Sequence, residues 1–147
     1  MKKSSTLQLE EFFITKLNVE YIEGSKNKTE DSTTYNLTMD YDVARHADNS
    51  NLFKLDFKVN NKPKRGQAGL AVNAELSGFF SFPEGTEEDE MQYLARVNGC
   101  SMLYSLLRGQ IAMVSGSFPG GKLNMPAIVI QDQIRKIEEK KQKLLHG

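Results

Sequence analysis

The chain has 147 residues with 19 basic and 19 acidic side chains, and its mean hydropathy of -0.49 predicts a soluble, cytoplasmic protein. Its length predicts one domain with a single core. Its zero formal charge argues against a general nucleic-acid binder. No run approaches the ~20 apolar residues of a membrane span. The single Cys100 excludes an intrachain disulfide.

Four stretches have the alternating apolar and polar residues that are typical of β-strands. They are residues 12–22, 35–43, 52–59 and 70–82. Residues 1–11 are expected to be flexible. The alternation breaks near Leu17 and Asn18, which suits a bulge, and 60–66 is expected to be a polar hairpin loop. Gly78 interrupts the last strand, so we expect a bulge or a close backbone approach there.

Two helices are expected after the strands. Thr86 precedes four acidic residues, which is typical of a helix start because a hydroxyl caps free amides and carboxylates favour the positive helix end. Apolar residues at steps of three and four predict one helix face over 100–114, and Gly116 ends that helix. Pro126 suits the first turn of a final helix, whose charged end at 135–147 is expected to project outward. The order predicts one α+β domain.

The joint order and spacing of these segments resemble the SecB family of protein-export chaperones. Residues 37–61, LTMDYDVARHADNSNLFKLDFKVNN, resemble the second and third SecB strands, and residues 70–85, LAVNAELSGFFSFPEG, resemble the fourth. Residues 96–129 resemble the first long helix, the turn ending in Phe-Pro and the Leu-Asn-aliphatic-Pro entry to the second helix. Arg108 has a counterpart in the family's first helix. The resemblance spans a SecB-like domain over 12–134.

This resemblance implies a SecB-like four-stranded antiparallel sheet followed by two helices, assembled as a homo-tetramer (a dimer of dimers), with no cofactor and no metal. It implies an activity of holding unfolded or nascent polypeptides in apolar grooves, often for delivery to the SecA motor in protein export.

Three departures put SecA in doubt as a partner. The family's first-strand Lys-Asp-x-Ser-Phe-Glu signature is replaced by LNVEYIE at 17–23, and Asn73 stands where the family has a glutamate associated with SecA docking. The chain is also neutral, whereas SecB proteins are acidic. A SecB-like protein with another client, such as the antitoxin of a toxin–antitoxin system, fits these departures better.

The apolar side of the second strand has two interpretations. It is ordinary core, or part of it lines a groove between the sheet and the final helix. Met and aromatic side chains suit a promiscuous groove because thioethers and flat rings repack against varied partners. The predicted peptide-binding residues are Leu37, Met39, Tyr41, Met125 and Val129. The predicted oligomer interface on the first helix is Met102, Leu103, Leu106 and Ile111.

No cluster of catalytic groups stands out, so we expect a protein that binds rather than an enzyme. Asp40 and Asp42 share one strand face, as a pair of acid/base carboxylates would, but the solvent face of an amphipathic strand also explains them. His46 lies in a polar loop, where one histidine is more often solvated than metal-bound. Cys100 is interpreted as a small buried hydrophobe rather than a nucleophile. The alternatives are a general chaperone, a binding module for one partner, and an enzyme.

Overall fold

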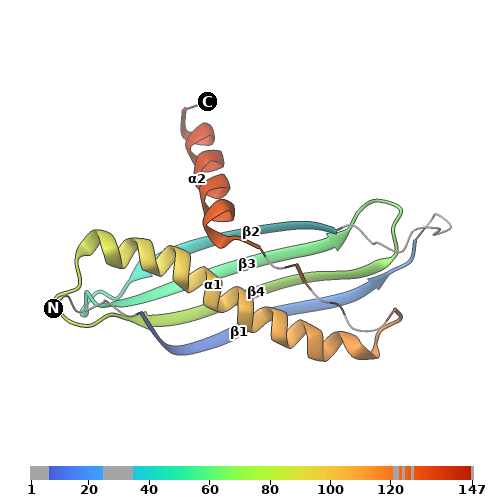
Figure 1. Cartoon of the computed structure of the whole chain (residues 1–147), viewed down its shortest axis with the longest axis horizontal. Helices are drawn as coiled ribbons and strands as arrows, with labels where there is room; N and C mark the ends of the chain where they lie inside the picture. Colours follow the sequence, from blue (N-terminus) through green and yellow to red (C-terminus); the bar gives the residue numbers. More distant parts are fainter. Residues whose placement is uncertain (1–6, 25–34, 121–122, 124, 127, 147) are drawn as a thin grey trace.

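A computed structural model describes residues 7–24, 35–120, 123, 125–126 and 128–146, except for the side chain of His146. The elements are β1 (Gln8–Ile22), β2 (Tyr35–Arg45), β3 (Leu52–Pro63), β4 (Gly69–Ser81), α1 (Glu88–Val114), a 3-10 turn (Ser115–Ser117) and α2 (Ile130–His146). The strands form an antiparallel sheet in the order β1-β4-β3-β2, and α1 crosses one face of it diagonally (Figure 1). The expected α+β architecture, with a four-stranded antiparallel sheet followed by two helices, is confirmed.

The sheet has one apolar face under α1, here called the helix face, and one polar face, here called the open face. Neighbouring side chains of a strand point to opposite sides of a sheet, so the alternating residues of β3 show which side chains belong to each face. Leu55 is on the helix face, since a Cβ added at Gly99 of α1 would lie 2.9 Å from its Cδ2 atom. In the next row of that face, Tyr41, Phe57, Leu76 and Ile14 lie side by side across all four strands.

The first strand begins at Gln8, earlier than the sequence predicted, and its irregularities lie elsewhere. Leu17 and Asn18 pair regularly with β4, whereas the register shifts between Leu9 and Glu11 and again between Ile14 and Lys16. The spacing of the apolar residues explains the second position. Ile14 and Leu17 both face the helix although they are three residues apart, and only an extra residue between them keeps both on that face.

The third strand also continues beyond its expected end. The stretch expected to be a loop from residue 60 remains in β3 as far as Pro63. The turn into β4 comes after it, where Gln67 N–H donates to the Lys64 carbonyl at 2.9 Å and Gly66 has a φ of 85°. Only glycine adopts this φ at little cost, so the turn forms at Gly66. As a consequence Asn61 belongs to the sheet, on the helix face.

The first helix starts without the predicted cap. The Thr86 hydroxyl donates to the Pro83 carbonyl at 2.6 Å, and the N-cap position is Glu87, whose side chain makes no cap hydrogen bond. The acidic first turn remains favourable to the helix dipole. The expected close approach at Gly78 is confirmed, because a Cβ there would lie 3.0 Å from Leu103 Cδ2. Gly78 itself stays in register with both neighbouring strands, so it forms no bulge.

The first helix ends on the β1 side of the sheet and α2 begins on the β2 side (Figure 1); the described residues between them, 115–120, 123, 125–126 and 128–129, are here called the crossover. Two α1 side chains fix this crossover: the Tyr104 hydroxyl donates to the Pro126 carbonyl at 2.6 Å, and Arg108 Nε donates to the Met125 carbonyl at 3.1 Å. Pro126 therefore belongs to the crossover and not to the first turn of α2, which begins at Ile130. From its start beside the sheet, α2 extends past the β2 edge (Figure 1).

Candidate functional site

The structure divides the predicted peptide-binding residues into three groups. Leu37 and Met39 are half-buried on the helix face of β2, and Val129 of the crossover is 61% exposed. Tyr41 and Met125 are buried, with 9% and 2% of their surface exposed, so they pack as core residues, which is one of the two interpretations that the sequence left open. Tyr35 joins Leu37 and Met39 as a half-buried neighbour on the same face. We name these three residues the β2 margin.

Tyr41 is buried because α2 closes over it. The Tyr41 hydroxyl donates to Glu138 Oε1 at 2.9 Å, and Arg96 Nε of α1 lies 3.2 Å from the same oxygen. Lys141 Nζ lies 4.8 Å from the centre of the Tyr41 ring and 3.5 Å from Asp40 Oδ1. Burial, and then the hydrogen bond that Tyr41 donates to Glu138, hold the pKa of the Tyr41 phenol well above its ordinary value.

The sequence did not predict these contacts between α2 and β2. Glu138 and Lys141 belong to the charged segment that was expected to project outward, and both instead contact β2. Their spacing of three residues places them on one helix face, but charge alone did not separate them from their solvated neighbours. The contact divides the outer edge of β2 at Tyr41 and leaves the β2 margin on one side of α2.

The β2 margin lies on a terminal strand of the sheet. Among the described strands, β2 pairs only with β3, so its other edge carries main-chain groups that no described strand uses. Such an edge is a template for an added strand, and alternate side chains beside it can accept apolar groups of the added chain. The combination of half-buried apolar side chains and a terminal strand is therefore suited to an extended polypeptide.

A second apolar margin follows β1. Its helix-face residues are half-buried where the diagonal α1 leaves the edge of the sheet; they are Leu9, Phe12, Ile14, Leu17 and Val19. Two of the predicted oligomer-interface residues, Met102 and Leu106, are half-buried on α1, and Met113 continues their stripe with 78% of its surface exposed. Leu103 and Ile111 are fully buried against their own sheet. They are therefore core residues and are not available to another subunit.

The open face of the sheet is polar. One row across it alternates in charge, as Asp40, Lys58, Glu75 and Lys16, and Lys58 Nζ lies 3.6 Å from Glu75 Oε1. The next row is uncharged and consists of Thr38, Asn60, Asn73 and Asn18. This pattern supports the interpretation of Asp40 and Asp42 as residues of a solvent face.

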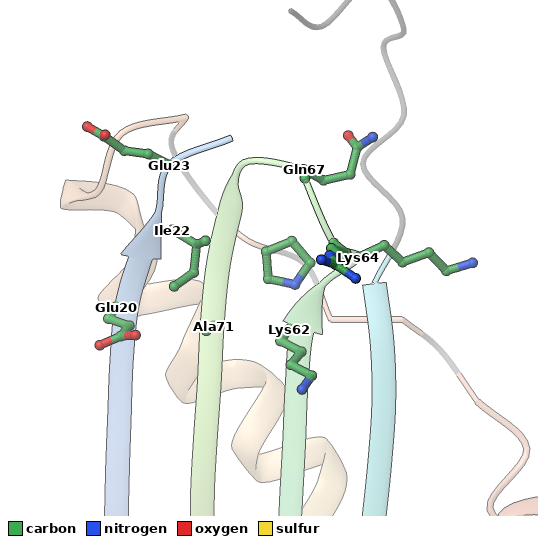
Figure 2. A pocket seen from close by; sticks show the side chains of 10 residues that line it. Glu20, Ile22, Glu23, Lys62, Lys64, Gln67 and Ala71 are labelled. Carbon is green, nitrogen blue, oxygen red and sulfur yellow. The ribbon is translucent and has the colours of Figure 1, made fainter. Parts of the chain in front are cut away.

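Near the β3–β4 turn, the open face has a hollow of about 330 Å³ (Figure 2). Ala71 forms its floor, Glu20 and Ile22 lie on the β1 side, and Lys62 and Lys64 lie on the β3 side. The small side chain of Ala71 between longer neighbours explains the depression. The carboxylate and the ammonium groups are on opposite sides of it, so the hollow is dipolar rather than acidic.

The remaining sequence candidates for chemistry have structural explanations. His46 Nδ1 accepts the main-chain N–H groups of Asp48 and Asn49 at 3.1 and 3.2 Å, which shapes the loop. Cys100 is 1% exposed, and burial raises the pKa of its thiol to about 12, so it is not a thiolate at neutral pH. Within the described part of the chain, no three acidic, histidine or cysteine side chains gather to hold a metal ion. None of the described helices is long and apolar enough to cross a membrane.

Comparisons with known proteins connect this geometry to one fold. No protein-family model and no curated protein sequence matches the chain. A solved structure with a similar fold is that of the SecB-like chaperone Rv1957 of Mycobacterium tuberculosis, in complex with a ChAD peptide from the HigA1 antitoxin Rv1956. The two share 15% identity with a TM-score of 0.64 over 83% of this chain and 90% of that one. The chain thus has a SecB-like fold.

A protein of unknown function from Streptococcus agalactiae is more distant, with 10% identity and a TM-score of 0.49 over 85% of this chain and 100% of that one.

Proposed function

We propose that this protein is a SecB-like chaperone that binds unfolded or partly folded polypeptides and catalyses no reaction. One observation carries the proposal: half-buried Leu37 and Met39 lie on the helix face of a terminal strand. The SecB-like fold supports it. An extended client would cover these side chains and pair its main chain with the free edge of β2.

The expected affinity of one such site is modest. Covering apolar surface contributes about 25 cal/mol per Å² before the cost of ordering the client is subtracted, and an unfolded client has much to order. A homo-tetramer would present several sites to one client and so raise the overall affinity through effective concentration. We therefore include tetramer formation in the proposal, through the exposed stripe of Met102, Leu106 and Met113 on α1.

The proposal is tested by placing a charge on either face of the same strand. Met39→Asp puts a carboxylate on the helix face, where desolvation without a partner weakens client binding. Thr38→Asp makes a comparable change one residue away, on the open face, and serves as the matched control. Fluorescence anisotropy with labelled, reduced and carboxymethylated α-lactalbumin measures binding. We expect Met39→Asp to bind at least about tenfold more weakly than Thr38→Asp. Equal affinity of the two folded variants would contradict the assignment.

A second candidate function is binding of one dedicated partner, such as an antitoxin. It is favoured by the complex of the Mycobacterium tuberculosis protein with an antitoxin peptide. The breadth of clients separates the two functions. A general chaperone suppresses aggregation of several unrelated unfolding proteins at similar concentrations, whereas a dedicated module protects one partner only.

SecA is not part of the proposal. The position that resembles the docking glutamate is Asn73, which lies in the uncharged row of the open face between Asn60 and Asn18. The nearby charged row is balanced in sign, so this face lacks the acidic field that would accelerate encounter with a basic partner.

A further inference from the structure

Asn61 lies at a position where its strand is otherwise apolar. The preceding helix-face residues of β3 are Phe53, Leu55, Phe57 and Val59, and each has 1% or less of its surface exposed. Asn61 follows them in the same alternation and is 0% exposed. Its neighbours across the sheet are Leu37 of the β2 margin and Val72 of β4. A polar amide is therefore buried in an apolar row, one strand inward from the β2 margin.

The side-chain amide of Asn61 is buried, and no described residue replaces the hydrogen bonds that it would make with water. Among the residues that the structure describes, neither Nδ2 nor Oδ1 has a hydrogen-bond partner. Nearly all buried polar groups in proteins are paired, because an unpaired one loses its hydration and gains nothing in return. A valine would fill this strand position at lower cost, as Val59 and Val72 do nearby. Asn61 thus reduces the stability of the unliganded chain, which suggests that it has a partner in another state.

The chemistry of the side chain indicates that partner. A primary amide offers an N–H donor and a carbonyl acceptor, which is the complement of a main-chain peptide group. We propose that Asn61 binds the main chain of an extended polypeptide held at the β2 margin, with Nδ2 donating to a client carbonyl and Oδ1 accepting a client N–H. This inference rests on the proposed function.

Main-chain recognition fits a protein with many clients. Every polypeptide carries the same main-chain groups, so Asn61 adds affinity without selecting a sequence. The amide is covered in the unliganded chain, and its cross-strand neighbour Leu37 is half-buried. A client segment that lies over the helix face of β2, beyond the part that pairs with its outer edge, therefore reaches Asn61 when it displaces the Leu37 side chain, and it satisfies the two amide atoms as it buries the apolar margin.

The experiment compares Asn61→Val with Asn60→Val, which makes the same chemical change on the open face of the same strand. Anisotropy with reduced, carboxymethylated α-lactalbumin gives the affinity, and urea denaturation gives the stability. We expect Asn61→Val to have a higher denaturation midpoint than the wild type and to bind the client about tenfold more weakly, the loss typical of one or two hydrogen bonds. Asn60→Val should bind as the wild type does.

Several outcomes would overturn the inference. If Asn61→Val is less stable or does not fold, the amide has a partner within the chain. If it is more stable and binds equally well, Asn61 is only an unfavourable core residue. Weak binding by Met39→Asp with unchanged binding by Asn61→Val would reject the role of Asn61 and leave the proposed function intact. A wild-type protein that binds no unfolded client would reject the proposed function itself, without reference to any variant.

A second measurement addresses the main chain directly. A short apolar peptide that binds the wild type is made with one amide at a time replaced by an ester, which removes a single N–H donor. At one position, the ester should weaken binding to the wild type and leave binding to Asn61→Val unchanged. Equal losses in both proteins at every position would exclude a hydrogen bond from the client to Asn61.

Discussion

Removal of the Glu138 carboxylate should loosen α2 from the sheet. Glu138 Oε1 accepts from the Tyr41 hydroxyl at 2.9 Å and lies 3.2 Å from Arg96 Nε. A hydrogen bond to a charged group contributes about 1.5–3 kcal/mol, and an ion pair that is partly exposed contributes about 0.2–1 kcal/mol. Because the Glu138 side chain is 46% exposed, we take the low end of both ranges. Glu138→Ala should therefore lower the free energy of unfolding by about 2 kcal/mol, and Glu138→Gln by about half as much because it keeps an acceptor for Tyr41.

Urea denaturation measures this loss, and hydrogen exchange localises it to α2. The neighbouring, exposed Glu139→Ala is the matched control and should stay within about 0.5 kcal/mol of the wild type. Absorbance titration provides an independent readout. Since the hydrogen bond to the Glu138 carboxylate helps to raise the pKa of Tyr41, that phenol should ionise at a lower pH in Glu138→Gln than in the wild type. If Glu138→Ala is as stable as Glu139→Ala and the phenol titration does not move, α2 is not held by this contact.

Three further predictions concern α1 and the core. Gly109→Ala should raise the free energy of unfolding by up to about 1 kcal/mol, and with it the melting temperature, because a Cβ there meets nothing within 4 Å. Gly99→Ala should lower the melting temperature because its Cβ would lie 2.9 Å from Leu55 Cδ2. The opposite order of the two melting temperatures would contradict the packing. Burial raises the pKa of the Cys100 thiol from 9.0 to about 12 and also raises those of two buried tyrosines, so the folded state keeps protons that the unfolded state loses. These three groups should leave the free energy of unfolding unchanged below about pH 8.5 and lower it between about pH 9 and 12, with a maximum slope of about 1.4 kcal/mol per pH unit for each group, and Cys100→Ala should reduce this slope; an unchanged slope would refute the assignment. Leu106→Asp should lower the mass measured by light scattering if the α1 stripe joins subunits, and a wild-type monomer at tens of micromolar would refute the proposed tetramer.

The strand pattern predicted most of the fold because period-2 alternation depends only on which face is buried. The β2 and β3 alternation predicted both strands, although β3 continues to Pro63, beyond its expected end. The bulge was misplaced because the break in alternation near Asn18 is less informative than the odd spacing of Ile14 and Leu17 on one face. The cap at Thr86 failed because a competing carbonyl, that of Pro83, lay within reach of the hydroxyl.

The candidate site was predicted less completely, because burial by a distant element leaves no local signal. Leu37, Met39 and Tyr41 form one alternating series, yet Tyr41 is covered by α2, nearly 100 residues later in the chain. Met125 likewise belongs to the core because α1 fixes the crossover through Arg108. Asn61 was assigned to a loop, since residues 60–66 contain Pro63 and three basic residues. Only the register of β3 shows that it is a buried member of the helix face.

The most direct test of the central claim is to identify the side of β2 that contacts a client. A photo-crosslinking residue is introduced singly at Asn36, Leu37, Thr38 and Met39, and each protein is irradiated with reduced, carboxymethylated α-lactalbumin. These positions alternate between the exposed open face and the half-buried helix face. We predict strong crosslinks from positions 37 and 39 and weak ones from 36 and 38. Equal crosslinking at all four positions, or crosslinks confined to 36 and 38, would contradict polypeptide binding at the β2 margin.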